Sequence, residues 1–100
     1  MGFIKITYGR AEVYSDSGSI LRSIGSGHIV DGDINSKGDA VLVTEDGKVE
    51  QYSESGSFIR GLCVGGKAVS ARISGDTISV RRADGHVEVY STSGCFLRCL

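Results

Sequence analysis

Proline is absent from this 100-residue sequence, and its first residues contain no long apolar run. Residues 1–10 largely alternate polar and apolar side chains, so they resemble neither a signal peptide nor a membrane-spanning helix. The myristoylation motif is incomplete as well, because Ile6 stands where that motif requires serine or threonine. We therefore expect no membrane association.

An excess of charge of either sign is also missing. Eleven basic and twelve acidic residues leave a formal net charge of −1. A general nucleic-acid binder needs a basic face that displaces counterions from phosphates, and an anionic membrane surface selects for the same feature. Nucleic acid is therefore an unlikely partner for this protein.

Cysteine is scarce, and Cys63, Cys95 and Cys99 match no zinc or redox spacing. An odd number of cysteines without a signal peptide predicts reduced thiols and a cytoplasmic location. We expect these cysteines to be small, partly buried residues. The sequence predicts no metal, no cofactor and no catalytic residue, and the glycines open no helix that could cradle a phosphate.

What the sequence does contain is a repeat. Tyr14, Tyr52 and Tyr90 are spaced by 38 residues, and each belongs to a segment of the pattern Gly-x-x-Glu-x-Tyr-Ser or a close variant of it. A Ser-Gly-x-apolar-apolar-Arg segment follows each tyrosine, at residues 17–22, 55–60 and 93–98. Self-similarity at a fixed period is typical of repeat architectures.

Each repeat predicts short antiparallel strands joined by tight turns. Asp46-Gly47 and Asp84-Gly85 are hairpin signals, and β-branched residues are frequent in the segments between turns. The expected strands include residues 29–35, 39–44, 49–53 and 57–62 of the middle unit, and 68–73 and 76–81 of the last one. No segment has helical periodicity of useful length.

We predict a single all-β domain, residues 1–100, built of antiparallel four-stranded repeats that resemble propeller blades. Residues 1–24 form a partial repeat that starts at the second strand, and residues 25–62 and 63–100 form two complete repeats. A β-sandwich, roll or prism with internal pseudo-symmetry is the alternative arrangement of the same strands.

The repeats resemble those of the NHL-type β-propeller family. Residues 11–25 are similar to the second half of such a repeat, and residues 33–62 are similar to a whole one. The Pro-x-Gly entry to the first strand, which is usual in that family, is missing here. The resemblance implies a propeller fold. It implies no reaction, because these repeats serve in protein binding, in RNA binding and in a few enzymes.

Fewer than three blades do not close a ring, so we expect the first and last blades to expose apolar faces. Stacked repeats bury such faces against neighbours. The sequence thus predicts homo-oligomerisation that completes the propeller, most simply as a homodimer.

Residues that recur in all three repeats are expected to be structural. The repeated tyrosines would pack between sheets with the hydroxyl at an edge. The arginines at positions 22, 60 and 98 would cover apolar surface or pair with the repeated glutamates at 12, 50 and 88. A ring of arginines that binds an anion is the functional alternative.

Residues outside the repeat are the candidates for function. The loops at residues 25–28, 44–48, 63–67 and 81–86 would share one rim, which we predict as the binding face. The candidate rim residues for a ligand or partner are His28, Asp31, Lys67, Arg81, Arg82 and His86. Two further hypotheses concern this set: a metal site of His28, Asp31 and Asp33, and an anion-binding spot at Arg81 and Arg82 joined by Arg72 and Lys67.

The favoured function is a non-enzymatic binding or scaffold module that takes a protein or small-molecule ligand. One alternative is a lectin-like protein that binds a carbohydrate or small molecule at repeated sites. Another is a hydrolase whose site is shared between chains.

Overall fold

Alternating apolar segments and glycine-containing turns fold into eleven strands in the computed structural model. The structure describes residues 2–25, 27–62 and 64–100, and this part of the chain contains no helix. The strands are β1 (Phe3–Thr7), β2 (Arg10–Tyr14), β3 (Ile20–Ile24), β4 (Ile29–Ile34), β5 (Ala40–Thr44), β6 (Val49–Tyr52), β7 (Phe58–Leu62), β8 (Ala68–Ser74), β9 (Thr77–Arg82), β10 (Val87–Ser91) and β11 (Phe96–Cys99).

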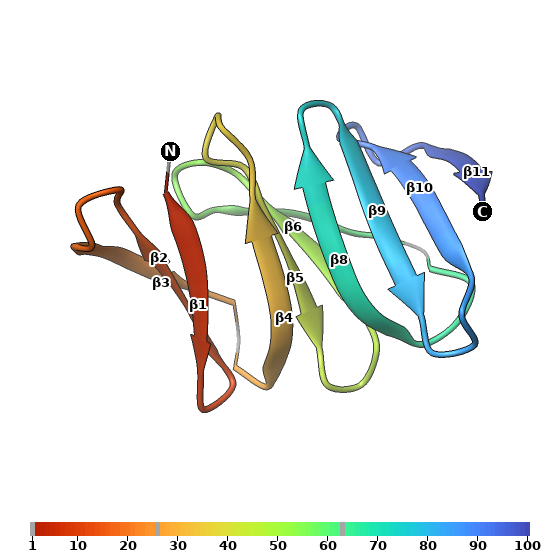
Figure 1. Cartoon of the computed structure of the whole chain (residues 1–100), viewed down its shortest axis with the longest axis horizontal. Coiled ribbons are helices and arrows are strands. Elements are labelled where there is room, and N and C mark those ends of the chain that lie inside the picture. Colours follow the sequence, from red (N-terminus) through yellow and green to blue (C-terminus); the bar gives the residue numbers. More distant parts are fainter. Residues whose placement is uncertain (1, 26, 63) are drawn as a thin grey trace.

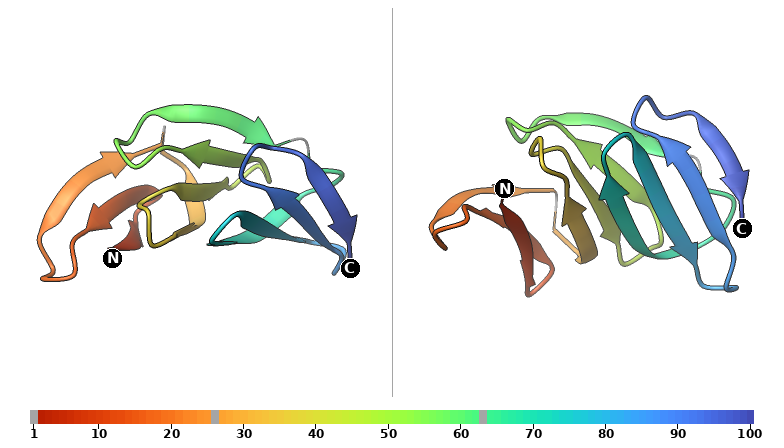
Figure 2. Two further views of the ribbon diagram at one scale, coloured as in Figure 1. Left: turned by 90° about the horizontal axis from the view of Figure 1, so that it is seen from above. Right: turned by 45° about the horizontal axis from the view of Figure 1, so that its top comes forward.

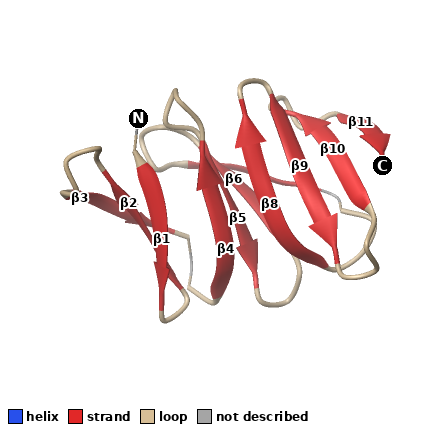
Figure 3. Cartoon of the chain, viewed as in Figure 1, coloured by secondary structure: helices blue, strands red, loops and turns tan. Residues whose placement is uncertain are grey.

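The strands form three antiparallel meanders. The first sheet has the order β1-β2-β3, the second β4-β5-β6-β7 and the third β8-β9-β10-β11. The sheets follow one another along an arc, with β1, β4 and β8 on its concave side and β3, β7 and β11 on its convex side (Figures 1, 2 and 3). This confirms the prediction of an all-β fold made of propeller-like blades.

Two apolar cores hold the arc together, one at each junction between sheets. The first junction lies between the first and second sheets and buries Ala11, Val13, Ile24, Ile29, Ile34, Ala40, Leu42 and Tyr52. The second junction lies between the second and third sheets and buries Val41, Val43, Val49, Leu62, Ala68, Ala71, Ile73, Ile78, Val80 and Tyr90. The second sheet therefore contributes one face to each core, as period-2 alternation in a buried strand requires.

The repeated tyrosines fill these junctions in two of the three sheets. Tyr52 and Tyr90 are 7% and 3% exposed, and their hydroxyls donate to the carboxylates of Glu50 and Glu88. Tyr14 has no preceding sheet to pack against and stacks on Phe3 of its own sheet, with ring centroids 5.3 Å apart. The structural interpretation of the tyrosines thus holds where a neighbouring sheet is present.

The repeated arginines do not pair with the repeated glutamates. Arg22 Nη1 donates to the backbone carbonyl of Glu54 at 2.8 Å, and Arg60 Nη1 donates to that of Thr92 at 2.8 Å. Both acceptors lie in the turn before the last strand of the following sheet. The expected pairing was wrong because the arginine side chain reaches across the junction instead of along its own sheet.

On the concave side, carboxylates of the second sheet bind backbone amides of the third. Asp31 Oδ2 accepts from Ala71 N at 3.1 Å, and Asp33 Oδ2 accepts from Ile73 N at 2.9 Å. These amides belong to β8, the innermost strand of its sheet. Two acidic side chains of β4 therefore take the place of an additional strand along this edge.

The two outward faces of the arc are more polar than the sequence led us to expect. In the first sheet Lys5 pairs with Glu12, and the equivalent pair in the second sheet is Leu42 with Glu50. A lysine on the outward face therefore occupies a position that holds leucine at the first junction. Arg81 likewise pairs with Val87 where Val43 pairs with Val49. Each outward face thus carries a cation at a position that is apolar inside the arc.

Candidate functional site

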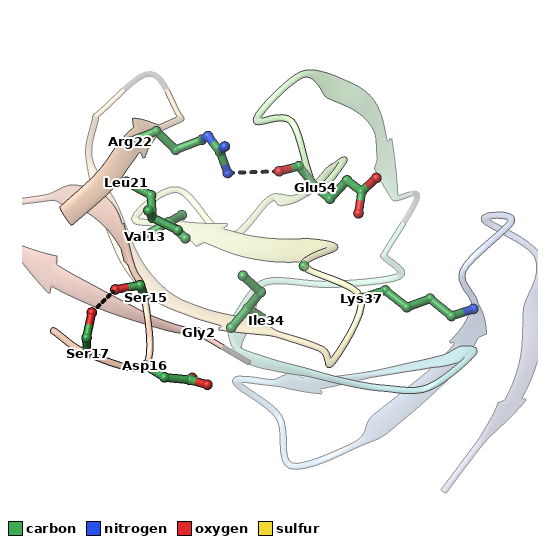
Figure 4. A pocket seen from close by; sticks show the side chains of 11 residues that line it. Gly2, Val13, Ser15, Asp16, Ser17, Leu21, Arg22, Ile34, Lys37 and Glu54 are labelled. Atoms are coloured by element: carbon green, nitrogen blue, oxygen red, sulfur yellow. Dashed lines mark hydrogen bonds between the residues drawn. The ribbon is translucent and has the colours of Figure 1, made fainter. Parts of the chain in front are cut away.

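An open pocket of about 600 Å³ lies at the first junction, on the edge of the arc that carries the turns between β2 and β3 and between β4 and β5 (Figure 4). Apolar side chains of both sheets contribute to its lining, and charged side chains of both signs join them. The lining residues are Gly2, Val13, Ser15, Asp16, Ser17, Leu21, Arg22, Ile34, Lys37, Gly38 and Glu54.

Local turn chemistry positions the polar side of this pocket. The β2–β3 turn is closed by Ser15 N, which donates to the carbonyl of Ser19 at 2.8 Å, and by Gly18 in the left-handed conformation. The hydroxyls of Ser15 and Ser17 are 2.9 Å apart and hydrogen-bond each other. Arg22 spans the pocket to the carbonyl of Glu54, as the dashed line in Figure 4 shows.

The two junctions differ at one position beside the arginine. Val13 lies beside Arg22 in the first sheet, whereas Gln51 lies beside Arg60 in the second. Gln51 Nε2 donates to the Thr92 carbonyl at 2.7 Å, and its Oε1 accepts from Arg60 at 2.8 Å. The valine can make neither bond, so Arg22 alone reaches across the equivalent space at the first junction.

The polar groups of this pocket are hydroxyls, carboxylates and cations. Its lining contains no histidine or cysteine, and its two serine hydroxyls bond each other. The charged side chains of the lining are Asp16, Arg22, Lys37 and Glu54. Sequence reasoning missed this pocket, although the break in the repeat from Val13 to Gln51 was its visible signal.

The opposite edge of the arc carries the loops that the sequence predicted as a rim, and we call it the loop edge. Its described loop segments are residues 25, 27–28, 44–48, 64–67 and 81–86, and small pockets lie along it. The loops are joined by backbone hydrogen bonds, from Glu45 N to the His28 carbonyl and from Ala83 N to the Lys67 carbonyl, each at 2.8 Å. Ser26 and Cys63 lie outside the described residues.

Three of the candidate rim residues are exposed on the loop edge. His28 Nδ1 lies 3.5 Å from Glu45, and His86 Nδ1 lies 3.2 Å from Asp84. Lys67 is exposed in the loop before β8. A hydrogen bond from the backbone amide of His86 is the main reason that the pKa of Asp84 lies below its usual value.

The other three candidates are not brought together. Asp31 lies within β4 and is held by Ala71 N and by Arg72 Nη1 at 2.7 Å. Arg81 and Arg82 are neighbours on β9 and so point to opposite faces of the sheet. Arg81 is exposed and Arg82 is largely buried, which separates the two cations of the expected basic spot.

Arg82 belongs to a buried polar cluster. Its Nη1 lies 3.0 Å from Glu88 Oε2 and its Nη2 lies 2.6 Å from Asp84. Glu88 also accepts from the hydroxyl of Tyr90 at 2.5 Å and from Gly65 N at 3.1 Å. Burial by itself would raise the pKa of Glu88, but these hydrogen bonds outweigh it and hold the pKa below its ordinary value. The cluster anchors the loop before β8 to the third sheet.

The remaining expectations concern metals and thiols. The hypothesis of a His28, Asp31 and Asp33 metal site finds no support, because the described residues contain no group of three or more His, Cys, Asp or Glu side chains that could hold a metal ion. Cys95 and Cys99 are free and exposed, so the expectation of partial burial was wrong for both. No helix in the described part of the chain is long and apolar enough to span a bilayer.

Comparisons with known proteins concern the fold. No protein-family model matches the sequence, and no curated protein matches it either. Among solved structures, BamB from Moraxella catarrhalis is similar at a TM-score of 0.77 and 18% identity, over 98% of this chain and 32% of that one. Kluyvelomyces marxianus Hsv2 is similar at a TM-score of 0.76 and 14% identity, over 97% of this chain and 34% of that one.

Both of these proteins are β-propellers, and this chain spans about a third of the length of each. Identities this low establish the fold and nothing more. Three consecutive meanders on an arc are therefore blades of a β-propeller, and the chain has a propeller-type fold.

Proposed function

We propose that the protein is a non-enzymatic binding or scaffold module whose blades are completed by association with a second copy. The observation that carries the proposal is the pair of apolar junctions inside the arc. Each buries a continuous core between neighbouring sheets, while the outer faces of the first and third sheets have no sheet against them. Repeat folds bury such faces by stacking.

The loop edge is the proposed place for a protein partner. Loops on a rigid scaffold are a common location for binding residues, and His28, Lys67 and His86 are exposed there. The similarity of the 38-residue unit to NHL-type repeats and a cytoplasmic location with reduced thiols are parts of the same proposal.

Light scattering on a sizing column, over a range of protein concentrations, tests the self-association. A mass twice that of the 10.5 kDa chain, or a larger multiple that grows with concentration, is the expected result. A monomer at every concentration contradicts the proposal and leaves the outer faces available to other partners.

A second candidate function is small-molecule or carbohydrate binding in the pocket at the first junction. Apolar Val13, Leu21 and Ile34 with charged residues around them can hold a ligand that has both apolar and polar groups. Because Gln51 bridges the second junction, we expect one such site per chain and not one per blade.

Val13→Gln is the matched variant for this second function. The new side chain can reproduce the bonds of Gln51, donating to the Glu54 carbonyl and accepting from Arg22, and so fill the pocket without altering the sheets. A glycan array and a thermal-shift screen should find ligands that stabilise the natural protein but not the variant. Equal stabilisation of both proteins would remove the pocket as the site.

The enzymatic alternative is a hydrolase whose site is shared between chains. A screen with esterase, phosphatase and glycosidase substrates at concentrations where the protein is associated tests it. Turnover that scales with the associated fraction would replace the binding proposal.

A further inference from the structure

The two junctions inside the arc are fastened by the same device. In each, the arginine of the last strand of one sheet crosses to the turn before the last strand of the following sheet. Arg22 donates to the carbonyl of Glu54, and Arg60 donates to the carbonyl of Thr92, both at 2.8 Å. Two occurrences with the same donor atom and the same turn position define a clasp that belongs to the repeat.

A glycine in the acceptor turn makes room for each arginine. A Cβ atom on Gly56 would lie 2.7 Å from Arg22 Cδ, and one on Gly94 would lie 2.7 Å from Arg60 Cδ. Contacts this short do not occur for real Cβ atoms, so the arginine stem lies directly over the glycine. The turn glycine, which has a positive φ, therefore also provides the surface on which the arginine stem lies, and we call it the seat of the clasp.

Arg98 and Gly18 are the counterparts of these arginines and glycines, and they do not form such a contact within the described part of the chain. Arg98 pairs with Val89 in the third sheet, as Arg60 pairs with Gln51 and Arg22 with Val13. Its side chain is exposed, and none of the described residues accepts a hydrogen bond from it. In the first sheet, Gly18 has a φ of +88°, the same as Gly56, but a Cβ atom there would meet nothing within 4 Å.

We propose that Arg98 of one copy lies over Gly18 of a second copy and donates to the Asp16 carbonyl of that copy. Asp16 precedes Gly18 by two positions, as Glu54 precedes Gly56 and Thr92 precedes Gly94. The clasp rests on the self-association proposed above and specifies its geometry. Because the donor face and the acceptor face are different surfaces, the contact is head-to-tail, and it closes into a ring when the rotation between copies permits.

A second copy fits these faces because the contact continues an interface that the chain already makes twice. Apolar side chains are available on both sides, namely Phe3 and Tyr14 on the acceptor face and Val87 and Leu100 on the donor face. Phe3 and Leu100 are 48% and 71% exposed in the single chain. Lys5 and Arg81 replace leucine and valine of the internal junctions, so this contact is weaker than they are and reversible.

Two single substitutions test the clasp from its two sides. Arg98→Gln removes the charged donor, and Gly18→Asn adds a side chain where the arginine stem would lie while keeping a residue that tolerates positive φ. Each should raise the dissociation constant about tenfold or more, as expected for a lost hydrogen bond from a charged group. Sedimentation equilibrium over a concentration series gives the constants.

Gly75→Asn is the matched control, because Gly75 also has positive φ and open space beside it but lies in the β8–β9 turn, which takes part in neither clasp face. It should leave association unchanged. Thermal unfolding at concentrations where the protein is monomeric shows whether each variant still folds.

Mixing the two variants provides a second readout that a general loss of stability would not give. Arg98→Gln retains an intact seat and Gly18→Asn retains an intact arginine, so a mixed pair can form one complete clasp. Association in the mixture should exceed that of either variant alone. A natural chain that stays monomeric overturns self-association and the clasp together. An associating chain that both variants leave unaffected, or no gain on mixing, overturns the clasp alone.

Discussion

The two internal junctions share one plan and differ in their polar contacts. At the second junction Gln51 joins Arg60 to the Thr92 carbonyl, while at the first Val13 leaves Arg22 alone on the Glu54 carbonyl. The first junction has a pocket of about 600 Å³, and a smaller one of about 280 Å³ lies at the second, lined by residues 33–36 and 73–75. Two junctions with the same apolar plan and the same arginine contact can thus differ in the size of the cavity between their sheets.

The largest effect is expected from the core of the first junction. Leu42 is fully buried there, so Leu42→Ala should lower the free energy of unfolding by about 3–4 kcal/mol through lost burial and the cavity left behind. Urea unfolding followed by circular dichroism measures the loss. Because the sheets share cores, one transition with an unchanged slope is expected; two separate transitions would show that the junctions unfold independently.

The next largest loss of stability is expected at Glu88 of the third sheet, and a smaller one at the equivalent Glu50 of the second. Glu88 is buried against Arg82, Tyr90 and Gly65 N, so Glu88→Gln should cost about 2–3 kcal/mol because it leaves the half-exposed Asp84 as the carboxylate partner of Arg82. Thr44 is the residue of the second sheet that is equivalent to Arg82, because Thr44 N donates to the Lys48 carbonyl as Arg82 N donates to the His86 carbonyl. Glu50→Gln should therefore cost less than about 1 kcal/mol. Equal losses would contradict the role given to Arg82.

The same cluster predicts a dependence of stability on acid. The pKa of Glu88 is lowered in the folded state, so its contribution is complete above its ordinary pKa of 4.5 and is lost as the pH falls through the folded pKa. Unfolding free energies measured at decreasing pH below that value should fall more steeply for the natural protein than for Glu88→Gln. Parallel pH profiles would show that other carboxylates dominate acid unfolding.

A smaller effect than those of Leu42→Ala and Glu88→Gln is expected when Gln51 of the second junction is replaced by the valine of the first. Gln51→Val removes two hydrogen bonds but leaves the Arg60 bond to Thr92, so it should cost about 1 kcal/mol. It should also open a second pocket, and ligands of the first pocket should then bind at two per chain. Calorimetric titration gives that stoichiometry, and an unchanged value of one would assign the pocket's specificity to residues other than Val13.

Much of the fold could be predicted because the repeat makes each local signal appear three times. Asp-Gly turns and alternating apolar residues located the strands to within one or two residues, as in the segment 49–53 and strand β6 (Val49–Tyr52). The destination of Arg22 and Arg60 could not be predicted, since their acceptors are backbone carbonyls of another sheet and carry no sequence signal. The fate of Asp31 escaped prediction because its partner, an amide of β8, is 40 residues away.

The pocket escaped prediction for a related reason. The candidate residues outside the repeat were charged or histidine side chains, whereas apolar residues such as Val13 form part of the pocket lining. The sequence also did not predict the cations on the outward faces. Lys5 and Arg81 can be assigned to a face of their sheets only when the residues that pair with them are known.

The carboxylates of Asp31 and Asp33 have a consequence for aggregation. An exposed edge strand offers unpaired amides on which strands of other molecules can grow into fibrils, and this chain has no proline to interrupt such growth. On β8, the amides of Ala71 and Ile73 are already occupied by the two carboxylates, which as acceptors cannot extend a β-ladder. Side chains from the neighbouring blade thus protect this edge from intermolecular strand addition.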